Sequence, residues 1–302
     1  MTDTRRARGL KGSLAFTASI AALTAAAGTA VGAGDPAAVA PGQSAARVAT
    51  AEDVVVRTPS FSMSAVHKRT MDLYLYFPDR EGGFEPQYDA AVSFEGVANA
   101  LRVDNDKDGE ADNVWYRHTD GLLTHTWSDG VNLHSKDIGR GWNTYTTILS
   151  PGNLGGAKQA DLIGVDKAGV LWLYLSYQDG RLTPRTRVGG GWGQYDQIAG
   201  QADLTGDGKA DIVTRDKAGV LWLYRGTGDY KAPFAGRTRI GGGWNAYDRL
   251  LSVGDLDMDG TPDLLARTPG GDLLRYSGTG SAQAPFAKPV KIGHGFQSYN
   301  LL

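Results

Sequence analysis

The sequence predicts an all-β protein, and within that class a five-bladed β-propeller of four-stranded blades. Three observations lead to this prediction: a glycine-rich composition, a repeat of about 50 residues, and a division of each repeat into four strand-sized pieces. The 302 residues include 42 Gly and 12 Pro, while aromatic residues make up 9 %. Glycine at this density interrupts helices, whereas the recurring aromatic and branched residues can build a core of short strands.

The repeat is visible in two kinds of segment. VDKAGVLWLY at 165–174 returns as RDKAGVLWLY at 215–224, and its Val-Leu-Trp-Leu-Tyr part is apolar on both faces. A strand that lies between two neighbouring blades needs that pattern. The second segment is a glycine–aromatic loop whose aromatic positions are 50, 52 and 52 residues apart. These positions are Trp142, Trp192, Trp244 and Phe296.

The last repeat shows how each period divides. We expect strands at 247–255, 263–267, 272–278 and 289–293, named A, B, C and D in that order. An acidic loop joins A to B, a glycine turn joins B to C, and the glycine–aromatic loop leads from D to the next A. Four short strands in one period are typical of a propeller blade.

A count of these strands gives five blades, one of them split between the two ends of the chain. The chain starts at a B strand and stops at an A strand, so residues 297–302 would complete the N-terminal blade. Such closure leaves no unpaired edge; the alternative is an open array that closes only by dimerising. Residues 59–70 would then be an insertion in the B–C turn of the split blade. The B strands are expected to begin at Asp53, Asp112, Asp161, Asp211 and Asp263, and the A strands to end near Arg102, Pro151, Ala202, Gly254 and the C-terminus.

Composition excludes several classes of protein. The absence of Cys rules out a disulfide scaffold, a thiolate nucleophile and a Cys-ligated zinc site. The formal net charge of −2 offers no basic footprint for nucleic acid.

The N-terminus predicts export. Residues 1–33 combine basic residues, an Ala-rich apolar stretch and a small-x-small cleavage site, so they are expected to be a signal peptide. Residues 34–51 are expected to be a flexible leader and 52–302 the propeller, which would act as a secreted monomer without a membrane partner. An uncleaved membrane anchor is the alternative for the first segment, and a loose twin-arginine pattern at its start leaves the export route open.

Three A–B loops carry acidic residues at a fixed spacing that points to calcium. Alternate carboxylates in a tight loop converge on one point, glycine permits the turn, and the following carbonyl can point inward. Hard oxygen ligands in a flexible loop suit Ca²⁺. The expected ligands are Asp104, Asp106, Asp108, Glu110 and Asp112; Asp203, Thr205, Asp207, Lys209 and Asp211; and Asp255, Asp257, Asp259, Thr261 and Asp263, where Glu110, Lys209 and Thr261 act through the backbone carbonyl.

These loops are not EF-hands, because the position of the essential Glu holds Trp115, Thr214 and Ala266, and strands flank them. The alternative is an Asx-turn that needs no metal, although clustered carboxylates would then repel one another. The fourth loop, 153–161, keeps only Asp161 and is expected to bind no metal. Asp53 stands alone in the split blade.

The loops and the period resemble the FG-GAP/VCBS-repeat family, which includes the calcium-binding blades of integrin alpha-chain propellers. The resemblance covers residues 52–302, although the literal Phe-Gly and Gly-Ala-Pro signatures are absent and family propellers often have seven blades. It implies about three structural Ca²⁺ sites that pin the A–B hairpins. The glycine–aromatic loops and the five-fold count look more loosely like tachylectin-type lectins, which bind amino sugars at repeated sites.

The aromatic loops have two interpretations. On one rim of the ring, their flat faces and neighbouring amides would suit sugars at up to four equivalent sites. Alternatively, the rings fill the wedge between blades. The first blade is expected to lack the motif, since Ser93-Phe94-Glu95-Gly96 stands in its place. The candidate ligand-binding residues are Trp142, Tyr145, Trp192, Tyr195, Trp244, Tyr247, Phe296 and Tyr299.

The function that these features favour is a calcium-stabilised binding module for a carbohydrate or cell-surface polymer. A propeller that binds an extracellular protein is the alternative. A propeller glycosidase is the third possibility, but the carboxylates outside the acidic loops repeat between blades, unlike one asymmetric catalytic site. These carboxylates are Asp166, Asp216, Asp196 and Asp248. No catalytic residue is expected, since the five His show no catalytic spacing.

Overall fold

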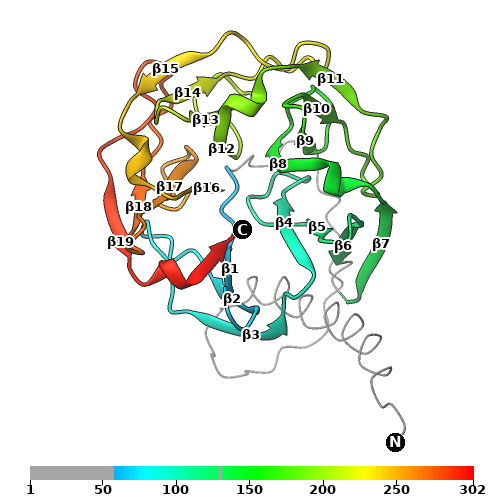
Figure 1. Ribbon diagram of the computed structural model, residues 1–302, viewed down its shortest axis with the longest axis horizontal. Helices are drawn as coiled ribbons and strands as arrows, with labels where there is room; N and C mark the ends of the chain where they lie inside the picture. Colours follow the sequence, from blue (N-terminus) through cyan, green and yellow to red (C-terminus); the bar gives the residue numbers. More distant parts are fainter. Residues whose placement is uncertain (1–57, 129–130) are drawn as a thin grey trace, which may run out of the picture.

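A computed structural model describes residues 58–128 and 131–302 and contains five four-stranded antiparallel sheets that stand in a ring (Figure 1). The predicted five-bladed propeller is therefore confirmed. In Figure 1 the strands β4, β8, β12 and β16 lie nearest the axis, and β3, β7, β11, β15 and β19 form the outer edge. Within residues 58–128 and 131–302, no helix is long and apolar enough to cross a membrane.

Each blade runs outward from its innermost strand. Blade 1 contains β20 (Tyr299–Leu301), β1 (Met63–His67), β2 (Asp72–Tyr76) and β3 (Tyr88–Ser93). Blade 2 contains β4 (Val97–Val103), β5 (Asn113–His118), β6 (Leu123–Ser128) and β7 (Leu133–Gly139). Blade 3 contains β8 (Tyr145–Gly152), β9 (Asp161–Asp166), β10 (Leu171–Tyr174) and β11 (Thr186–Gly189). Blade 4 contains β12 (Tyr195–Ala199), β13 (Ile212–Asp216), β14 (Leu221–Tyr224) and β15 (Thr238–Gly241). Blade 5 contains β16 (Arg249–Gly254), β17 (Asp263–Arg267), β18 (Leu273–Tyr276) and β19 (Val290–Gly293).

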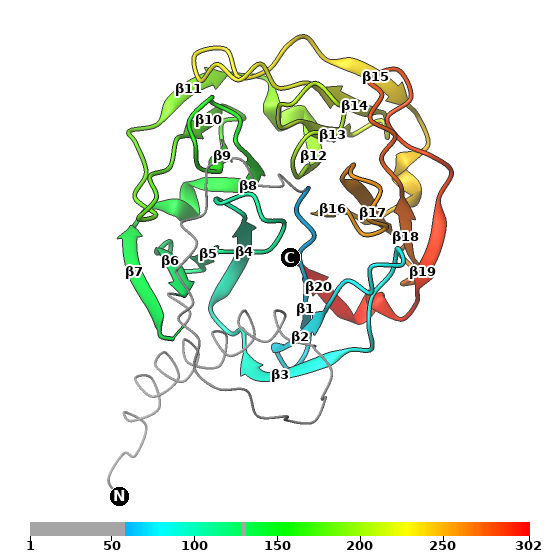
Figure 2. The same ribbon diagram turned by 180° about the vertical axis from the view of Figure 1, so that it is seen from behind.

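The two ends of the described chain close the ring. Strand β20 pairs antiparallel with β1, with Ala65 opposite Leu301 and His67 opposite Tyr299. The Leu302 N–H adds a bond of 2.9 Å to the carbonyl of Ser64. Figure 2 shows β20 beside β1 from the opposite side of the ring. Blade 1 is thus the split blade that the sequence predicts, and its edge is paired.

The position of the B strand in this split blade was predicted wrongly. The B strand is β1, at Met63–His67, and residues 59–70 are not an insertion, because they contain this strand and its turn. The side chains of Met63, Ala65 and Val66 are buried, so this short stretch supplies the core contacts that the DVVVRT segment was expected to supply. Asp53 itself lies outside the described residues.

Each interface between blades, called a seam below, is filled by a cluster of apolar side chains. The crossing aromatics Trp142, Trp192, Trp244 and Phe296 sit in these clusters, one in each of four seams. Phe94, which is 1 % exposed, fills the seam between blades 1 and 2. The first crossing therefore does have the motif, contrary to the prediction, with phenylalanine in place of tryptophan.

A repeated backbone bond holds each crossing aromatic on the preceding blade. The N–H of Trp142 donates to the carbonyl of Gly121 in the β5–β6 turn, at 3.0 Å. The same bond recurs from Phe94 to Met71, at 2.7 Å, and Met71 has the left-handed φ of 61° that glycine adopts in the other blades. The crossings and the B–C turns therefore share one face of the ring. The remaining three bonds run from Trp192 to Gly169, from Trp244 to Gly219 and from Phe296 to Gly271.

Buried arginines strengthen the same junctions. The Arg267 guanidinium on β17 is paired with Asp248 at 2.8 Å and donates to the carbonyls of Phe296 and Tyr299 at 3.0 and 2.6 Å. Arg215 makes the matching contacts one blade earlier, with Asp196 as its acidic partner. The repeated Asp196 and Asp248 are thus used to fasten one blade to the next crossing.

The first described residues cross the middle of the ring. The Ser60 N–H donates to Gly109 at 2.9 Å, and the Phe61 N–H donates to Val253 at 2.7 Å, so this segment ties β16 to the loop after β4. Gly254 has φ of +98°, and a Cβ there would lie 1.6 Å from the Pro59 carbonyl oxygen. Only glycine permits this close approach.

Candidate functional site

The acidic loops lie between the first and second strands of blades 2, 4 and 5. In the first loop, carboxylate oxygens of Asp104, Asp106 and Asp108 lie within 4.8 Å of one another. In the third loop, Asp255 and Asp257 converge in the same way with Asp263. Among the described residues, the loop at 203–211 does not form such a group. The structure therefore gathers three of the predicted carboxylates in each of two loops, and Asp112 and Asp259 are not among them.

The last Asp of each loop has a second task that does not need a metal. Asp211 accepts the backbone N–H groups of Leu204 and Thr205 at 3.1 and 3.0 Å, which closes the loop onto the start of β13. Asp161 does the same for Leu154 and Gly155, in the loop where no metal is expected. The Asp at the ninth position thus accepts the hydrogen bonds that close the loop, whether or not a metal is expected. The acidic residues at the earlier positions distinguish a loop that is expected to bind a metal from one that is not. Asp112 and Asp263 occupy the matching positions.

The turn itself is shared by all three acidic loops. The backbone N–H at the seventh position donates to the Asp two residues before it in each case. Asp104 and Asp203 also accept backbone N–H groups from inside their own loops. The donors at the seventh position are Glu110, Lys209 and Thr261, with Asp108, Asp207 and Asp259 as acceptors.

Burial makes these carboxylates hard to ionise without a counter-charge. Desolvation raises the pKa of Asp104 to about 6, that of Asp211 to about 6 and that of Asp263 to about 7. Neighbouring acidic residues raise them further, whereas backbone N–H groups oppose the shift. A divalent cation would favour the ionised forms, so the donor set fits Ca²⁺.

The loop in blade 5 already has a positive neighbour. A guanidinium nitrogen of Arg275 lies 3.0 Å from Asp257, and another lies 4.0 Å from Asp263. The Ser277 hydroxyl also donates to Asp257 at 2.8 Å. The other carboxylate oxygen of Asp257 is buried and has no hydrogen-bond partner among the described residues. Arg275 therefore offsets part of the negative charge in this loop. The loop at 104–112 has an arginine contact only at its exposed edge, where Arg80 lies 3.6 Å from Glu110 among the described residues.

The crossing aromatics do not form exposed platforms. Trp142, Trp192, Trp244 and Phe296 are only 5–8 % exposed, so the packing interpretation holds for these four rings and the interpretation as open sugar-binding faces does not. Each Trp packs on a tyrosine of the third strand of its own blade, with ring centroids 4.8 Å apart.

The tyrosines that follow the crossing aromatics join hydroxyl pairs. The hydroxyl oxygens of Tyr145 and Tyr174 lie 2.5 Å apart. The same hydroxyl pairing occurs between Tyr195 and Tyr224 and between Tyr247 and Tyr276. Tyr299 differs, since its hydroxyl accepts from Gln87 at 3.3 Å. Burial and the neighbouring hydroxyl raise the pKa of Tyr174, so its hydroxyl stays protonated at neutral pH.

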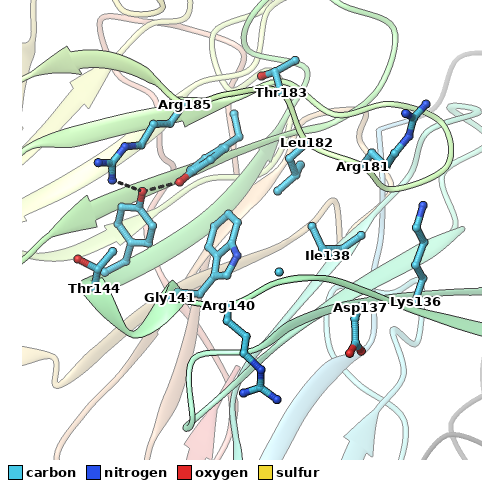
Figure 3. Close-up of a pocket in the computed structure, with 14 residues that line it drawn as sticks. Lys136, Asp137, Ile138, Arg140, Gly141, Thr144, Arg181, Leu182, Thr183 and Arg185 are labelled. Carbon is cyan, nitrogen blue, oxygen red and sulfur yellow. Dashed lines mark hydrogen bonds between the residues drawn. The ribbon is translucent and has the colours of Figure 1, made fainter.

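A groove of about 610 Å³ opens at one seam, between blades 2 and 3 (Figure 3). Strand β7 and the crossing after it form one side, and β10 with the loop that leads to β11 forms the other. Its apolar lining includes Ile138, Trp142, Tyr174 and Leu182. The groove thus brings together two of the predicted aromatic residues, Trp142 and Tyr145, in a partly open site.

Polar groups flank this apolar lining. Arg185 donates to the Tyr145 hydroxyl at 3.3 Å, and its guanidinium lies 4.0 Å from the Trp172 ring centroid. Figure 3 shows Arg185 at one end of the groove and Lys136 with Arg181 at the other. The groove can therefore offer hydrogen-bond donors at both ends of an apolar floor. Apart from Trp142 and Tyr145, the sequence analysis missed these residues.

The remaining carboxylates of the sequence analysis have structural partners. Asp166 accepts the Trp172 indole N–H at 2.8 Å and two backbone N–H groups of its own turn. Asp216 makes the same three contacts, with Trp222 as the indole donor. These residues stabilise B–C turns in separate blades and do not converge on one point.

The comparisons with known proteins agree with the loops. A model of the FG-GAP-like repeat matches residues 203–266, and a model of the FG-GAP repeat matches residues 249–284. No curated protein sequence matches this chain.

Several solved structures are similar at low identity. They include BP39L lectin from Burkholderia pseudomallei, with 13 % identity over 79 % of this chain and 71 % of that chain and a TM-score of 0.44. A mutant of Aleuria aurantia lectin in complex with alpha-methyl-L-fucoside has 12 % identity over 78 % of this chain and 79 % of that chain, with a TM-score of 0.39. Prp20p from Saccharomyces cerevisiae has 11 % identity over 78 % of this chain and 62 % of that chain, with a TM-score of 0.37. Likeness at this level says nothing about what this chain binds. The chain is therefore a five-bladed β-propeller in which residues 203–284 match models of the FG-GAP repeat.

Proposed function

We propose that this protein is a secreted, calcium-stabilised binding module and that its ligand is a carbohydrate. The observation that carries this proposal is the groove between blades 2 and 3, with its aromatic floor and polar ends. Its volume of about 610 Å³ lies within the range of small-molecule sites.

The chemistry of the groove suits a sugar ring. A sugar presents C–H groups on its faces and hydroxyls around its edge, so it needs an apolar surface with hydrogen-bond groups beside it. Trp142, Tyr174 and Ile138 supply apolar surface, while the Tyr145–Tyr174 hydroxyl pair and Arg185 supply donors and acceptors. An indole or phenol edge at the floor is enough, so the tryptophans need not stand free in solvent.

In this proposal calcium has a structural task. The loops at 104–112 and 255–263 hold convergent carboxylates, and the loop at 203–211 carries the same spacing of acidic residues in the sequence. A cation in each loop would link the first two strands of its blade. The residues that would bind it are those predicted from the sequence, and none of them lines the groove.

Export is proposed from the sequence alone. Residues 1–33 have the pattern of a signal peptide, and they lie outside the described residues. Expression of the full chain in a bacterial host, followed by mass spectrometry of the product in the medium, tests this proposal. A mature N-terminus near residue 34 is expected, and a cell-bound product with an intact N-terminus would contradict it.

Binding of an extracellular protein is the second candidate. A single groove on one seam, rather than four equal sites, is the kind of asymmetric surface that a protein partner would use. Hydrolysis has less support, because Asp166, Asp216, Asp196 and Asp248 are each engaged in turn or blade contacts.

A glycan array and pull-down on insoluble polysaccharides, with calcium and with EDTA, test the carbohydrate proposal. Leu182→Phe is the matched variant, because it places an aromatic ring on the groove floor at a position where the natural protein has none. We expect saturable binding by the natural protein and none by Leu182→Phe. No glycan binding under either condition would overturn the proposal and direct the search to protein partners.

A further inference from the structure

One position in the loop between the third and fourth strands decides whether a seam is open. In blade 3, Leu182 forms an isolated β-bridge with Ser176. The same bridge recurs in blades 4, 5 and 1, where the residue is Phe234, Phe286 and Phe84. In each loop the carbonyl of the residue before this position accepts a backbone hydrogen bond. The Tyr177 N–H donates to Arg181 in blade 3, and the Thr227 N–H donates to Pro233 in blade 4. The bridges therefore place these four residues at matching points of their loops, although the loops of blades 4 and 5 are two residues longer than those of blades 3 and 1.

The phenylalanines fill their seams. Phe234 lies 5.8 Å from both Trp192 and Tyr224, measured between ring centroids. Phe286 lies 6.4 Å from Trp244 and 6.3 Å from Tyr276. Phe84 packs on Tyr76 at 6.1 Å. Leu182 has no ring, so the space beside Trp142 and Tyr174 stays open and forms the groove. Among the four seams whose loops the structure describes in full, this is the one without a phenylalanine.

Positive charge collects at the same seam. Lys136 lies opposite His125 in the β6–β7 pairing, and the strand registers place Thr186, Thr238 and Val290 at the matching positions of three other seams. Arg181 is matched by Pro233 and Pro285, which precede the phenylalanines. The open seam thus has cations at two positions where the residues compared in the filled seams are neutral.

Carboxylates balance only part of this charge. Asp179 is 2.6 Å from Arg181 and 3.7 Å from Lys136, so one carboxylate serves two cations. Arg140 is paired with Asp120 at 2.7 Å, and Figure 3 shows Arg140 and Asp137 directed away from the side where Arg185 and Arg181 lie. Arg185 has no carboxylate within 4.0 Å among the described residues. Its guanidinium contacts the Tyr145 hydroxyl and the Trp172 ring, and it also interacts with the Tyr174 hydroxyl and, at longer range, with Asp166. The cations at the two ends of the groove therefore outnumber the acidic groups that face them.

We propose that this groove is a single site for an acidic, carboxylate-bearing sugar, held on the aromatic floor with its charge against Arg185 or against Lys136 and Arg181. The inference rests on the proposed carbohydrate function and narrows it in two ways. It gives one site per chain instead of one per seam, and it selects charged over neutral sugars.

The test compares matched ligands and matched variants. The ligands are trigalacturonic acid with its methyl ester, a hyaluronan tetrasaccharide with its carboxyl-reduced form, and an array that holds sialylated and neutral glycans. The variants are Leu182→Phe, which copies the filled seams, and Lys136→Thr with Arg181→Ala, which removes the two additional cations. Arg187→Ala is the control, because Arg187 is an exposed cation of β11 outside the groove.

We expect at least one carboxylated glycan to bind and its neutral partner to bind about tenfold more weakly or not at all. Leu182→Phe should abolish binding, and the double cation variant should weaken it about tenfold while Arg187→Ala leaves it unchanged. Equal binding of neutral and carboxylated partners would overturn this inference and leave the carbohydrate function standing. Binding that survives Leu182→Phe would overturn the placement in the groove, and an array with no bound glycan would overturn both proposals.

Discussion

Leu182 and Phe234 occupy matched positions in consecutive blades, and the seam is open where the leucine stands. Each residue forms the same isolated bridge to the end of its third strand, so the exchange of side chains is the difference between the two loops at this point. Because Phe already fits this loop geometry in blades 4, 5 and 1, the fold should accept Leu182→Phe.

The two exchanges should have opposite effects on stability. Phe234→Leu removes ring contacts with Trp192 and Tyr224 and should lower the free energy of unfolding by about 1 kcal/mol. Leu182→Phe buries additional apolar surface, so it should leave the free energy of unfolding unchanged or raise it by a fraction of about 1 kcal/mol. Urea unfolding of both variants checks this, and a strong loss of stability in Leu182→Phe would show that the two positions are not equivalent.

The buried Arg267 should contribute more to the stability of the propeller than a surface arginine does. Its replacement by Ala leaves the Phe296 and Tyr299 carbonyls without their donor and Asp248 without its partner. We expect a loss of about 2–3 kcal/mol, below the full cost of breaking a buried ion pair because Asp248 is partly exposed. Thermal unfolding measures it, with Arg187→Ala as the control. Equal effects of the two variants would contradict the role of Arg267 as a tie between blades.

Acid should destabilise the propeller partly through His125. This ring is 1 % exposed, packs between Trp115 and Trp127, and has no hydrogen-bond partner for either nitrogen among the described residues. Burial lowers its pKa to about 4; Asp179 opposes the shift and Lys136 adds to it. An unfolded His titrates near 6.5, so the unfolded state binds the proton first. The stabilisation present above pH 6.5 is therefore lost as the pH falls towards 4, by up to about 3 kcal/mol.

His125→Leu isolates this effect, because Leu173 and Leu223 occupy the matching register in blades 3 and 4. Stability measured by urea unfolding between pH 7 and pH 4 should fall less steeply in this variant than in the natural protein. Parallel curves for the two proteins would mean that His125 is protonated in the folded state as easily as in the unfolded one.

Calcium should raise the stability of the propeller. At about 2 mM Ca²⁺ and a dissociation constant of about 0.2 mM, each site contributes about 1.4 kcal/mol, so EDTA should lower the melting temperature by several degrees. Asp106→Asn should remove the stability that one calcium site contributes, while the Asn side chain still provides an acceptor for the Asp108 N–H. Asp229→Asn is the matched control, since Asp229 accepts an N–H two residues on in an exposed turn. A melting temperature that EDTA does not change would contradict the calcium sites.

Much of this architecture could be read from the sequence because the repeats share their turn chemistry. Glycine turns, alternating strands and nine-residue acidic loops fix the number of blades and the closure by β20, and the structure confirms both. Blade 1 was harder, since Met71 replaces the turn glycine and a short MSAVH strand replaces the expected DVVVRT. Phe94 was missed for a similar reason, because it lacks the glycine-tryptophan signature but fills the same space.

The site could be predicted only in part. Carboxylate spacing within one loop is local, so the convergence of Asp104, Asp106 and Asp108 follows from sequence. The groove depends on contacts between blades, which no single repeat shows. Its one signal in the sequence is the leucine at 182 where the matched loops hold phenylalanine, and that signal gains meaning only when the β-bridges align the loops.

The number of ligand sites tests the central claim most directly. Isothermal titration of the carboxylated glycan that binds best on the array, with the natural protein and Leu182→Phe, measures that number. One site per chain that disappears in Leu182→Phe is the predicted result. Four sites, or one site that Leu182→Phe retains, would contradict the claim that a single open seam of this propeller holds the ligand.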